Sequence, residues 1–455
     1  MSLVISVHML NAQIILPEAL KLPIEQAINR SKEIENKKIN LEIAEKDLEM
    51  IKRKYIPQVD ATAGYTYTYN RMILDLPTLE LPISGAELFA DKTNIDANGN
   101  LFHGGIMAKS VIYSGNQIPS GAKAMKEKMR GDAFLLETNK DSIALDVITT
   151  FDQLRLIDAS EELIRDSNRR LNKEEDRVQK AIENGLAIPF DREKIRLARI
   201  ELDAKQNELE QMRSLIYHKL TYLTGMDREE LLQISYELGP FFLTDGLHIN
   251  DKAEIAALEA YQQAGKHLYE KERGSFRPQA LAFAGASYTG IFNGKSDFHL
   301  NNLPPQYSNP ILELNQFSMA PNLMVGVALQ WNIYGAGERK RKVEQSQLNI
   351  KQIDNKLEDT RDKLTLLLHQ KESAYKTQWK QIDLAHQQEV VAKNSLIMAQ
   401  KQYEKGMISI TQRLEAENDF IKAGHNTTET LINQRKTALE LVLTTGKLTH
   451  KIQYQ

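Results

Sequence analysis

The stretch VDATAGYTYTYN, residues 59–70, alternates between two kinds of side chain. Its odd positions carry Val59, Ala61 and Ala63 followed by three tyrosines, whereas its even positions are Asp, Thr, Gly or Asn. Alternation over about ten residues predicts a strand whose two faces meet different surroundings. A soluble β-sandwich and a membrane β-barrel both produce this pattern, so the stretch alone leaves both open.

The composition of the 455-residue chain excludes several classes of function. The 58 basic and 61 acidic residues give a net charge of −3, which offers no electrostatic case for binding nucleic acid. The absence of cysteine excludes disulfides, zinc–cysteine sites and thiol catalysis. The ten histidines are scattered, which argues against a metal centre. We therefore expect no enzyme, no cofactor and no metal.

The first 12 residues resemble the end of a secretory signal, with an apolar run from Leu3 to Leu10 and a small residue, Ala12, before Gln13. No Lys or Arg precedes Lys21, so the basic segment of such a signal is missing. We expect 1–12 to be a truncated signal peptide, with an ordinary buried strand as the alternative. Elsewhere no run of 18 apolar residues occurs, so no transmembrane helix is expected.

The opening stretch has a partner in the second half of the chain. IPQVDATAGYTY (56–67) aligns with RPQALAFAGASY (277–288), an offset of 221 residues between positions 56 and 277. The same offset pairs Gly105 with Gly326 and Gly185 with Gly406. One constant offset over about 170 residues predicts a duplicated unit with the same element lengths in both copies.

Each half is predicted to run helix, strand, loop, strand, long helix, turn, helix. The first repeat, 13–225, is expected to hold helices at 24–55, 120–184 and 189–224, and strands at 58–70 and 102–113. The second repeat, 250–446, is expected to hold helices at 250–275, 338–405 and 410–445, and strands at 279–292 and 323–334. A connecting segment at 226–249 and a C-terminal tail at 447–455 complete the chain.

The two longest predicted helices exceed the size of a compact domain, since 60 to 68 residues span roughly 90 to 100 Å. Val343, Ile350, Leu357 and Leu364 recur at every seventh position, which predicts a coiled-coil seam. The shorter helices of each half would stack end to end along one long helix. A soluble antiparallel coiled coil is the plain alternative.

The number of predicted strands bears on whether one chain could form a membrane barrel by itself. Leu323, Val325, Val327 and Leu329 form one strongly apolar face, and each strand has about 10 to 12 residues, enough to cross a bilayer obliquely. Four strands per chain cannot close a barrel, for which about eight is the minimum. A membrane protein of this kind would therefore be an oligomer.

A duplicated helix-strand-strand-helix-helix unit resembles the TolC-type outer-membrane efflux family over residues 22–448. The matching features are Pro57-Gln58 and Pro278-Gln279 at the helix–strand junctions, YSG (113–115, with Gly115) and YGAG (334–337, with Gly335) at the turns after the strands, and the hairpin tips NGLAIPFD (184–191) and KGMISITQ (405–412). The resemblance implies a membrane α+β fold: a homotrimer with a 12-stranded β-barrel, continued by a periplasmic α-helical barrel.

The resemblance also implies a function without a reaction centre. Such a protein lies in the outer membrane of a Gram-negative bacterium and passively conducts substrates received from a periplasmic adaptor and an inner-membrane transporter. Its partners would be itself, that adaptor, that transporter and the lipid bilayer. A soluble periplasmic coiled-coil adaptor or scaffold remains the alternative, and the sequence does not reveal the substrate.

The resemblance further implies two sets of site residues. Gly185-Leu186 and Gly406-Met407 stand where the family's hairpin tips meet the adaptor, although plain turn chemistry also explains these glycines. Members of the family often place two carboxylates after the second tip, where this chain has Gln412 and Glu415. The entrance would then be less acidic, with Asp191 as a further contributor. Val59, Ala61 and Ala63 would face lipid, and Asp60 and the threonines the lumen.

Overall fold

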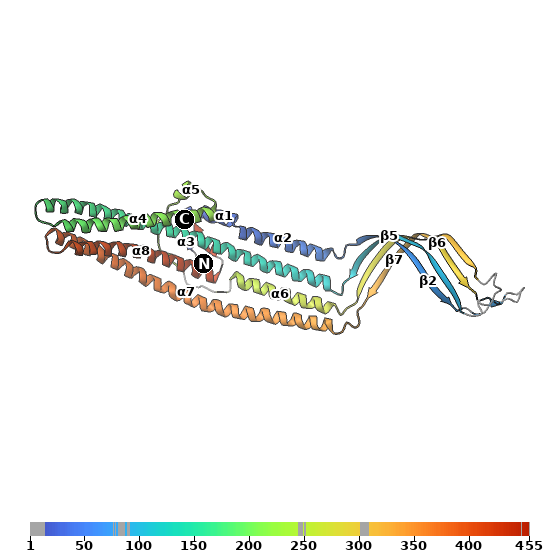
Figure 1. Ribbon diagram of the computed structural model, residues 1–455. Coiled ribbons are helices and arrows are strands. Elements are labelled where there is room, and N and C mark those ends of the chain that lie inside the picture. The colour runs from blue at the N-terminus through green and yellow to red at the C-terminus, as the bar shows by residue number, and fades with distance from the viewer. Residues whose placement is uncertain are drawn as a thin grey trace, which may run out of the picture. The chain divides into compact units, whose positions relative to one another are not determined.

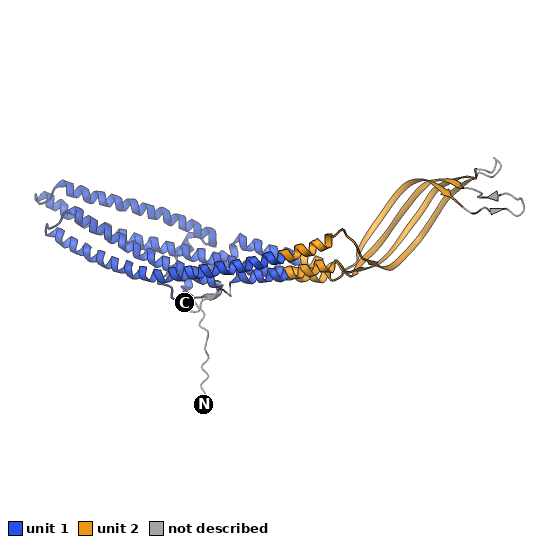
Figure 2. Ribbon diagram, turned by 90° about the horizontal axis from the view of Figure 1, so that it is seen from below, with its two compact units in different colours: residues 1–45, 126–264, 349–455 blue, residues 46–125, 265–348 orange. Residues whose placement is uncertain are grey.

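The computed structural model describes residues 14–75, 77, 79–80, 87–88, 92–243, 249, 252–300, 309–446 and 448–454. The chain forms two compact units, coloured separately in Figure 2. Unit 1 comprises residues 1–45, 126–264 and 349–455, and unit 2 comprises 46–125 and 265–348. Each unit takes residues from both halves of the sequence, so neither predicted repeat is a compact unit by itself. The predicted signal segment, 1–12, lies outside the described residues.

Unit 2 contains a four-stranded antiparallel sheet with the strand order β2-β5-β6-β7 (Figure 1). Its strands are β2 (Gln58–Leu74), β5 (Thr93–Tyr113), β6 (Gln279–His299) and β7 (Ile311–Gln330). The two halves of the sequence meet at the central pair, where β5 lies beside β6. Among the described residues, the outer edges of β2 and β7 pair with no other strand.

Three of the four strands extend well beyond their predicted ends. The strand predicted at 102–113 begins at Thr93, and the one predicted at 279–292 continues to His299. The strand predicted at 323–334 runs from Ile311 to Gln330, shifted toward the N-terminus. The polar residues at these strand ends predict loop, but strand pairing satisfies the backbone N–H and C=O groups whatever the side chain. Most of the remaining loop residues, 76, 78, 81–86, 89–91 and 301–308, lie outside the described residues, and β3 (Leu79–Glu80) pairs with β4 (Glu87–Leu88).

The register brings the apolar positions of the four strands onto one face. Val59 lies opposite Ala108, Ala108 opposite Ala284, and Ala284 opposite Val325. Directly opposite residues share a face of a sheet. We call this the apolar face, and the other, which carries the row Asp60, Met107, Gly285 and Met324, the mixed face.

Long helices follow the strands in each half of the chain. α3 (Gln117–Glu183) and α7 (Glu338–Glu404) each have 67 residues, and α4 (Pro189–Thr224) and α8 (Ile410–Thr445) each have 36. These bounds lie close to the predicted ones. The first residues of each pair, 117 and 338 or 189 and 410, are 221 positions apart, the offset found in the sequence. On the predicted seam of α7, Leu357 and Leu364 pack with Ile255 and Leu258 of α6 (Ala253–Gly274).

The helix predicted at 24–55 is two helices, α1 (Lys21–Arg30) and α2 (Lys32–Arg53). They meet at Ser31, whose backbone is extended, with φ −60° and ψ 116°. The Ser31 hydroxyl accepts a hydrogen bond of 3.3 Å from the backbone N–H of Ile34. A serine that caps a new helix in this way competes with helix continuation. The sequence pattern did not separate a capping serine from an ordinary one.

The main core of unit 1 lies where α1, α3, α4 and α8 meet. Its buried residues include Val147, Phe151 and Leu154 of α3, Leu220 of α4 and Leu439 of α8. The short strand β1 (Ile14–Leu16) and the 3-10 helix η1 (Glu18–Leu20) also contribute to it. Part of the predicted tail, 447–455, is also structured: α9 (Leu448–Lys451) leads into β8 (Ile452–Tyr454), which pairs with β1 in parallel.

The connecting segment after α4 is held by buried polar contacts. It contains α5 (Arg228–Leu232), closed at its start by a capping box between Asp227 and Glu230. Further along, Tyr236 donates a 2.8 Å hydrogen bond to Asp152, which also receives two bonds, 2.8 and 3.0 Å, from Arg435. Asp152 and Arg435 are both almost fully buried. The ion pair joins α3 to α8, and the hydrogen bonds from Tyr236 to Asp152 and from Arg435 to the carbonyl of Gly239 attach the connecting segment to it.

Candidate functional site: the helix-hairpin tips

The first hairpin turns between α3 and α4 at Gly185. Gly185 has φ +69°, and the N–H of Leu186 bonds the carbonyl of Ala181 at 2.8 Å. This is a left-handed helix ending, a backbone conformation that glycine adopts without strain. The Leu186 side chain is 83% exposed. The turn therefore presents a large apolar residue to its surroundings.

The second hairpin turns between α7 and α8 in the same way. Gly406 has φ +68°, the N–H of Met407 bonds the carbonyl of Gln402 at 2.9 Å, and Met407 is 68% exposed. Ser409 then caps α8, accepting a bond from the N–H of Gln412, whose side chain accepts one from the N–H of Ser409. The four predicted tip residues thus lie at two turns of matching geometry.

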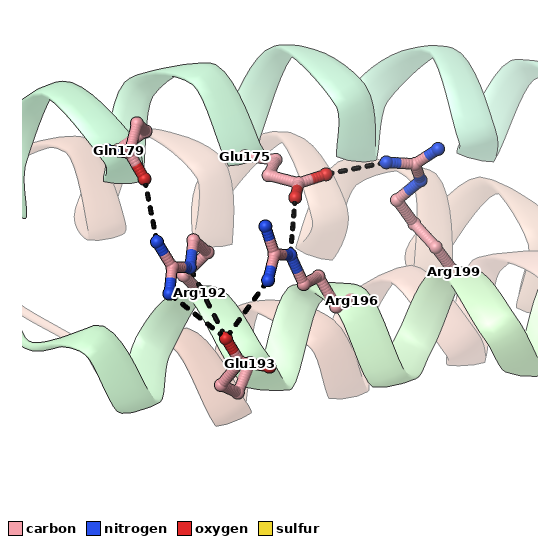
Figure 3. Close-up of polar contacts among 6 residues, drawn as sticks. All are labelled: Glu175, Gln179, Arg192, Glu193, Arg196 and Arg199. Carbon is pink, nitrogen blue, oxygen red and sulfur yellow. Dashed lines mark hydrogen bonds and ion pairs between the residues drawn. The ribbon is translucent and has the colours of Figure 1, made fainter.

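Behind the first tip, charged side chains join α3 to α4 (Figure 3). Glu175 of α3 accepts from Arg196 at 3.0 Å and from Arg199 at 2.6 Å, and Gln179 accepts from Arg192. Burial acts to raise the pKa of the Glu175 carboxyl, but the hydrogen bonds from the two arginines outweigh it and the pKa is lowered. These contacts tie the two helices of the hairpin together at its end.

The predicted entrance residues occupy different settings. Gln412 takes part in the cap of α8. The residue that departs from the family's acidic pattern therefore has a structural role. Glu415 is exposed, and it lines a cavity of about 260 Å³ with Leu197 of α4. Asp191 lies in the first turn of α4, where the helix dipole favours a negative charge. No hydrogen bond or ion pair between described residues joins these three side chains within one chain.

A buried charged network between α3 and α8 was missed by the sequence reading. One oxygen of Glu417, Oε1, accepts from Ser167 at 2.7 Å and from two nitrogens of Arg170 at 2.9 and 2.6 Å. Arg413 is fully buried, and its Nη2 lies 3.1 Å from Glu417 Oε2. Burial raises the pKa of the neighbouring Glu174 carboxyl, against the opposing charges of Arg413 and Arg177.

The signal for this network was present in the spacing of α8. Ile410, Arg413, Glu417 and Ile421 follow one another at intervals of three and four residues and are all buried. That spacing marks one face of a helix. Charged residues on an otherwise apolar face predict a buried pair, which a reading of each charge as solvated overlooks.

The predicted junction residues lie between helices and strands of unit 2. Pro57 and Pro278 directly precede β2 and β6. Gly115 has φ +64°, and a Cβ there would lie 2.6 Å from the carbonyl oxygen of Gly274. At the second junction the left-handed residues are Ala336 and Gly337 rather than Gly335. Ala336 is 221 positions after Gly115, so it, and not Gly335, is the counterpart of that glycine.

Among the described residues, no group of three or more His, Asp or Glu side chains is placed to hold a metal ion. None of the helices, as far as the structure describes them, is long and apolar enough to cross a membrane.

No protein-family model and no curated protein sequence matches the chain. Several solved structures do match the chain. CusC, described as forming a transmembrane channel, matches with a TM-score of 0.72 and 12% sequence identity, over 97% of this chain and 95% of that one. The Campylobacter jejuni CmeC outer membrane channel matches with a TM-score of 0.69 and 16% identity, over 97% of this chain and 90% of that one. The Vibrio cholerae outer membrane protein VceC matches with a TM-score of 0.66 and 14% identity, over 94% of this chain and 96% of that one.

These structures share an arrangement of strands and long helices with this chain over nearly its full length. The resemblance to the TolC-type family is therefore confirmed at the level of the fold. The chain has the fold of the TolC-type outer-membrane channels.

Proposed function

We propose that the chain is one protomer of an outer-membrane exit duct. In this role it passively conducts substrates from an inner-membrane transporter and a periplasmic adaptor to the exterior of a Gram-negative cell. The observation that carries the proposal is a four-stranded sheet whose two outer edges pair with no other described strand, in a chain that matches outer-membrane channels over 94% to 97% of its length.

The open edges support assembly into a trimer. An unpaired strand edge is a template for pairing with another chain. Three sheets of four strands, with β2 of one protomer beside β7 of the next, would close a 12-stranded barrel, whereas one sheet falls below the minimum of about eight. The trimer would thereby satisfy the backbone groups of both edges.

The apolar face supports contact with lipid. On β7, Leu323, Val325, Val327 and Leu329 are between 71% and 84% exposed in the single chain. Such a continuous apolar surface is unusual on a protein that meets only water. Farther along the same face, Tyr65 lies opposite Phe102, and the Phe102 ring packs 5.9 Å from the ring of Tyr288. Aromatic side chains gather in this way where a membrane-spanning strand meets the interface.

The hairpin tips support docking of a second protein. Leu186 and Met407 project large apolar side chains from two turns of matching geometry. Exposed Leu and Met at a tip are suited to an apolar pocket of an adaptor. In this proposal Gly185, Leu186, Gly406 and Met407 form the adaptor contact, and Glu415 and Asp191 line the entrance of the duct.

The proposal is tested by fractionating cells that express the full-length protein. We expect it in the outer membrane, extractable only by detergent, with a detergent-corrected mass of three chains and a stable conductance in planar bilayers. A monomer recovered from the periplasm without detergent would contradict the proposal and favour the alternative, a soluble coiled-coil adaptor or scaffold.

A further inference from the structure

The mixed face of the sheet carries an apolar patch beside the helix junctions. Gln58, Lys109, Phe283 and Gly326 form one row across the four strands of this face. The neighbouring rows add Met107 and Leu281. This is the face on which Asp60 and the threonines of β2 lie, so a cluster of Met, Leu and Phe there departs from a polar lining.

The patch surrounds a cavity of about 640 Å³. Met107, Leu281, Phe283 and Ala328 supply its apolar walls, and Lys54 and Lys109 supply its charge. A volume between about 300 and 1,000 Å³ is typical of pockets that bind small organic molecules. The cavity therefore has room for a ligand with a substantial apolar body.

The position of the Phe283 ring depends on a glycine. A Cβ at position 326 would lie 2.7 Å from the Phe283 ring, closer than real contacts allow. The ring thus covers Gly326 on the mixed face, and any larger residue there would displace it. The absence of a side chain at Gly326 thus leaves room for the aromatic wall of the cavity.

The charges at the cavity are of one sign. Lys54 and Lys109 both line it, no carboxylate does, and neither ammonium group has an ion-pair partner among the described residues. Asp60 lies in the next row of the same face and is not part of the lining. Two unpaired cations beside apolar walls are complementary to an anion with an apolar body.

We propose that this cavity is a binding site for amphipathic organic anions, with Lys54 and Lys109 holding the anionic group and Met107, Leu281 and Phe283 holding the apolar body. Sheet residues form the cavity together with Lys54 and Ile56, which precede β2 in the same unit. Its location in the path of exported molecules rests on the proposed function. In a trimer, the three copies would form a ring of such sites on the inner wall.

The test uses the full-length protein in planar bilayers, with decanoate as the probe. Decyltrimethylammonium has the same chain with the opposite charge, and butyrate the same charge with a short chain. We expect decanoate to reduce the single-channel current at concentrations where the other two have no effect. The double variant Lys54→Glu/Lys109→Glu should weaken this block at least about tenfold. Lys295→Glu, on β6 outside the cavity, should not.

Two results would overturn the proposal: equal block by decanoate and decyltrimethylammonium, or full block in the double variant. Absence of any conductance would instead count against the proposed function. The site is then decided by equilibrium dialysis of radiolabelled decanoate against wild type and the double variant in lipid nanodiscs. More decanoate bound by the wild type supports the site, and equal amounts contradict it. Gly326→Val, which displaces the Phe283 ring without changing charge, should lower decanoate binding as well.

Discussion

Arg413 Nη2 lies 3.1 Å from Glu417 Oε2, and the two side chains are 0% and 4% exposed. The contact is an ion pair without hydrogen-bond geometry, so the three side-chain nitrogens of Arg413 have no hydrogen-bond acceptor among the described residues. Glu417 has more hydrogen-bond partners than Arg413, because its other oxygen, Oε1, accepts hydrogen bonds from Ser167 and Arg170. The charge of Arg413 is therefore balanced mainly by Glu417.

Removing one member of this pair should cost more than removing both. Glu417→Ala leaves Arg413 as a buried cation without its partner, a change that typically destabilises by about 3 to 5 kcal/mol. We expect a clear fall in the melting temperature, followed by circular dichroism at 222 nm. Arg413→Leu/Glu417→Leu should melt above Glu417→Ala. If the double variant were the less stable of the two, an uncompensated charge on Arg413 would be excluded as the cause of the loss in Glu417→Ala.

Glu174 should make the hairpin region less stable as the pH rises. Burial raises the pKa of its carboxyl above the ordinary 4.5, so the folded chain retains a proton that the unfolded chain has lost. The associated stability is complete below the unfolded pKa and is lost as the pH rises through the folded one. Glu174→Gln should therefore raise the melting temperature more at pH 7 than at pH 4.5.

The control for this pH effect is Asp419→Asn, on the exposed part of α8. Its melting temperature relative to wild type should change little between the two pH values. A Glu174→Gln effect that is the same at pH 4.5 and pH 7 would show that folding leaves the pKa of this carboxyl unchanged, against the shift expected from its burial.

We expect the hairpin turns to require glycine only because it adopts a positive φ without strain, and not because a side chain would clash there. At Gly406 a Cβ would meet nothing within 4 Å, but φ is +68°, so Gly406→Ala should cost about 1 kcal/mol through strain. Gly185→Ala should lower the stability by a similar amount, because Gly185 also has a positive φ and open space around it. Gly64 also has open space and no left-handed backbone, so Gly64→Ala should leave the melting temperature unchanged or higher. Equal losses at Gly64 and Gly406 would exclude strain as the cause.

Tyr375 should govern local opening of the connecting segment. Its hydroxyl donates to the carbonyl of Phe241 at 2.9 Å and accepts from the N–H of Leu243 at 3.0 Å. Each such bond contributes about 1 kcal/mol. Tyr375→Phe should speed hydrogen exchange of the Leu243 amide while leaving α3 protected. Tyr222→Phe, at a side chain that is 78% exposed, serves as the control.

Glu415 should influence ion selection if it lines the entrance. Three exposed carboxylates around a pore favour cations, so Glu415→Ala should lower the cation-to-anion permeability ratio roughly twofold. Reversal potentials in a salt gradient across a planar bilayer provide the measurement. Asp383→Ala, at an exposed position of α7, should have no effect. An unchanged ratio in Glu415→Ala would remove this residue from the entrance.

The elements that the sequence predicted best were those set by local pattern. α4 and α8 have the bounds that turn residues and helical periodicity indicated. At the end of α4, Gly225 has a φ of +80°, and a glycine in this conformation ends a helix through its own backbone. Strand ends were predicted poorly. The polar residues Asn94, Asp96 and Asn98 continue β5 only because β2 and β6 lie on either side of it, which local pattern does not contain.

By itself the sequence determined the order of elements, the 221-residue offset and the alternation of VDATAGYTYTYN, since each depends on residues close together or on repetition. Only the tertiary structure decided which residues share a face or a core. It placed Phe283 over Gly326 and buried Arg413 beside Glu417, contacts that depend on strand register and helix packing. A one-residue change of register would move every side chain of a strand to the other face, which is why such contacts follow from packing rather than from pattern.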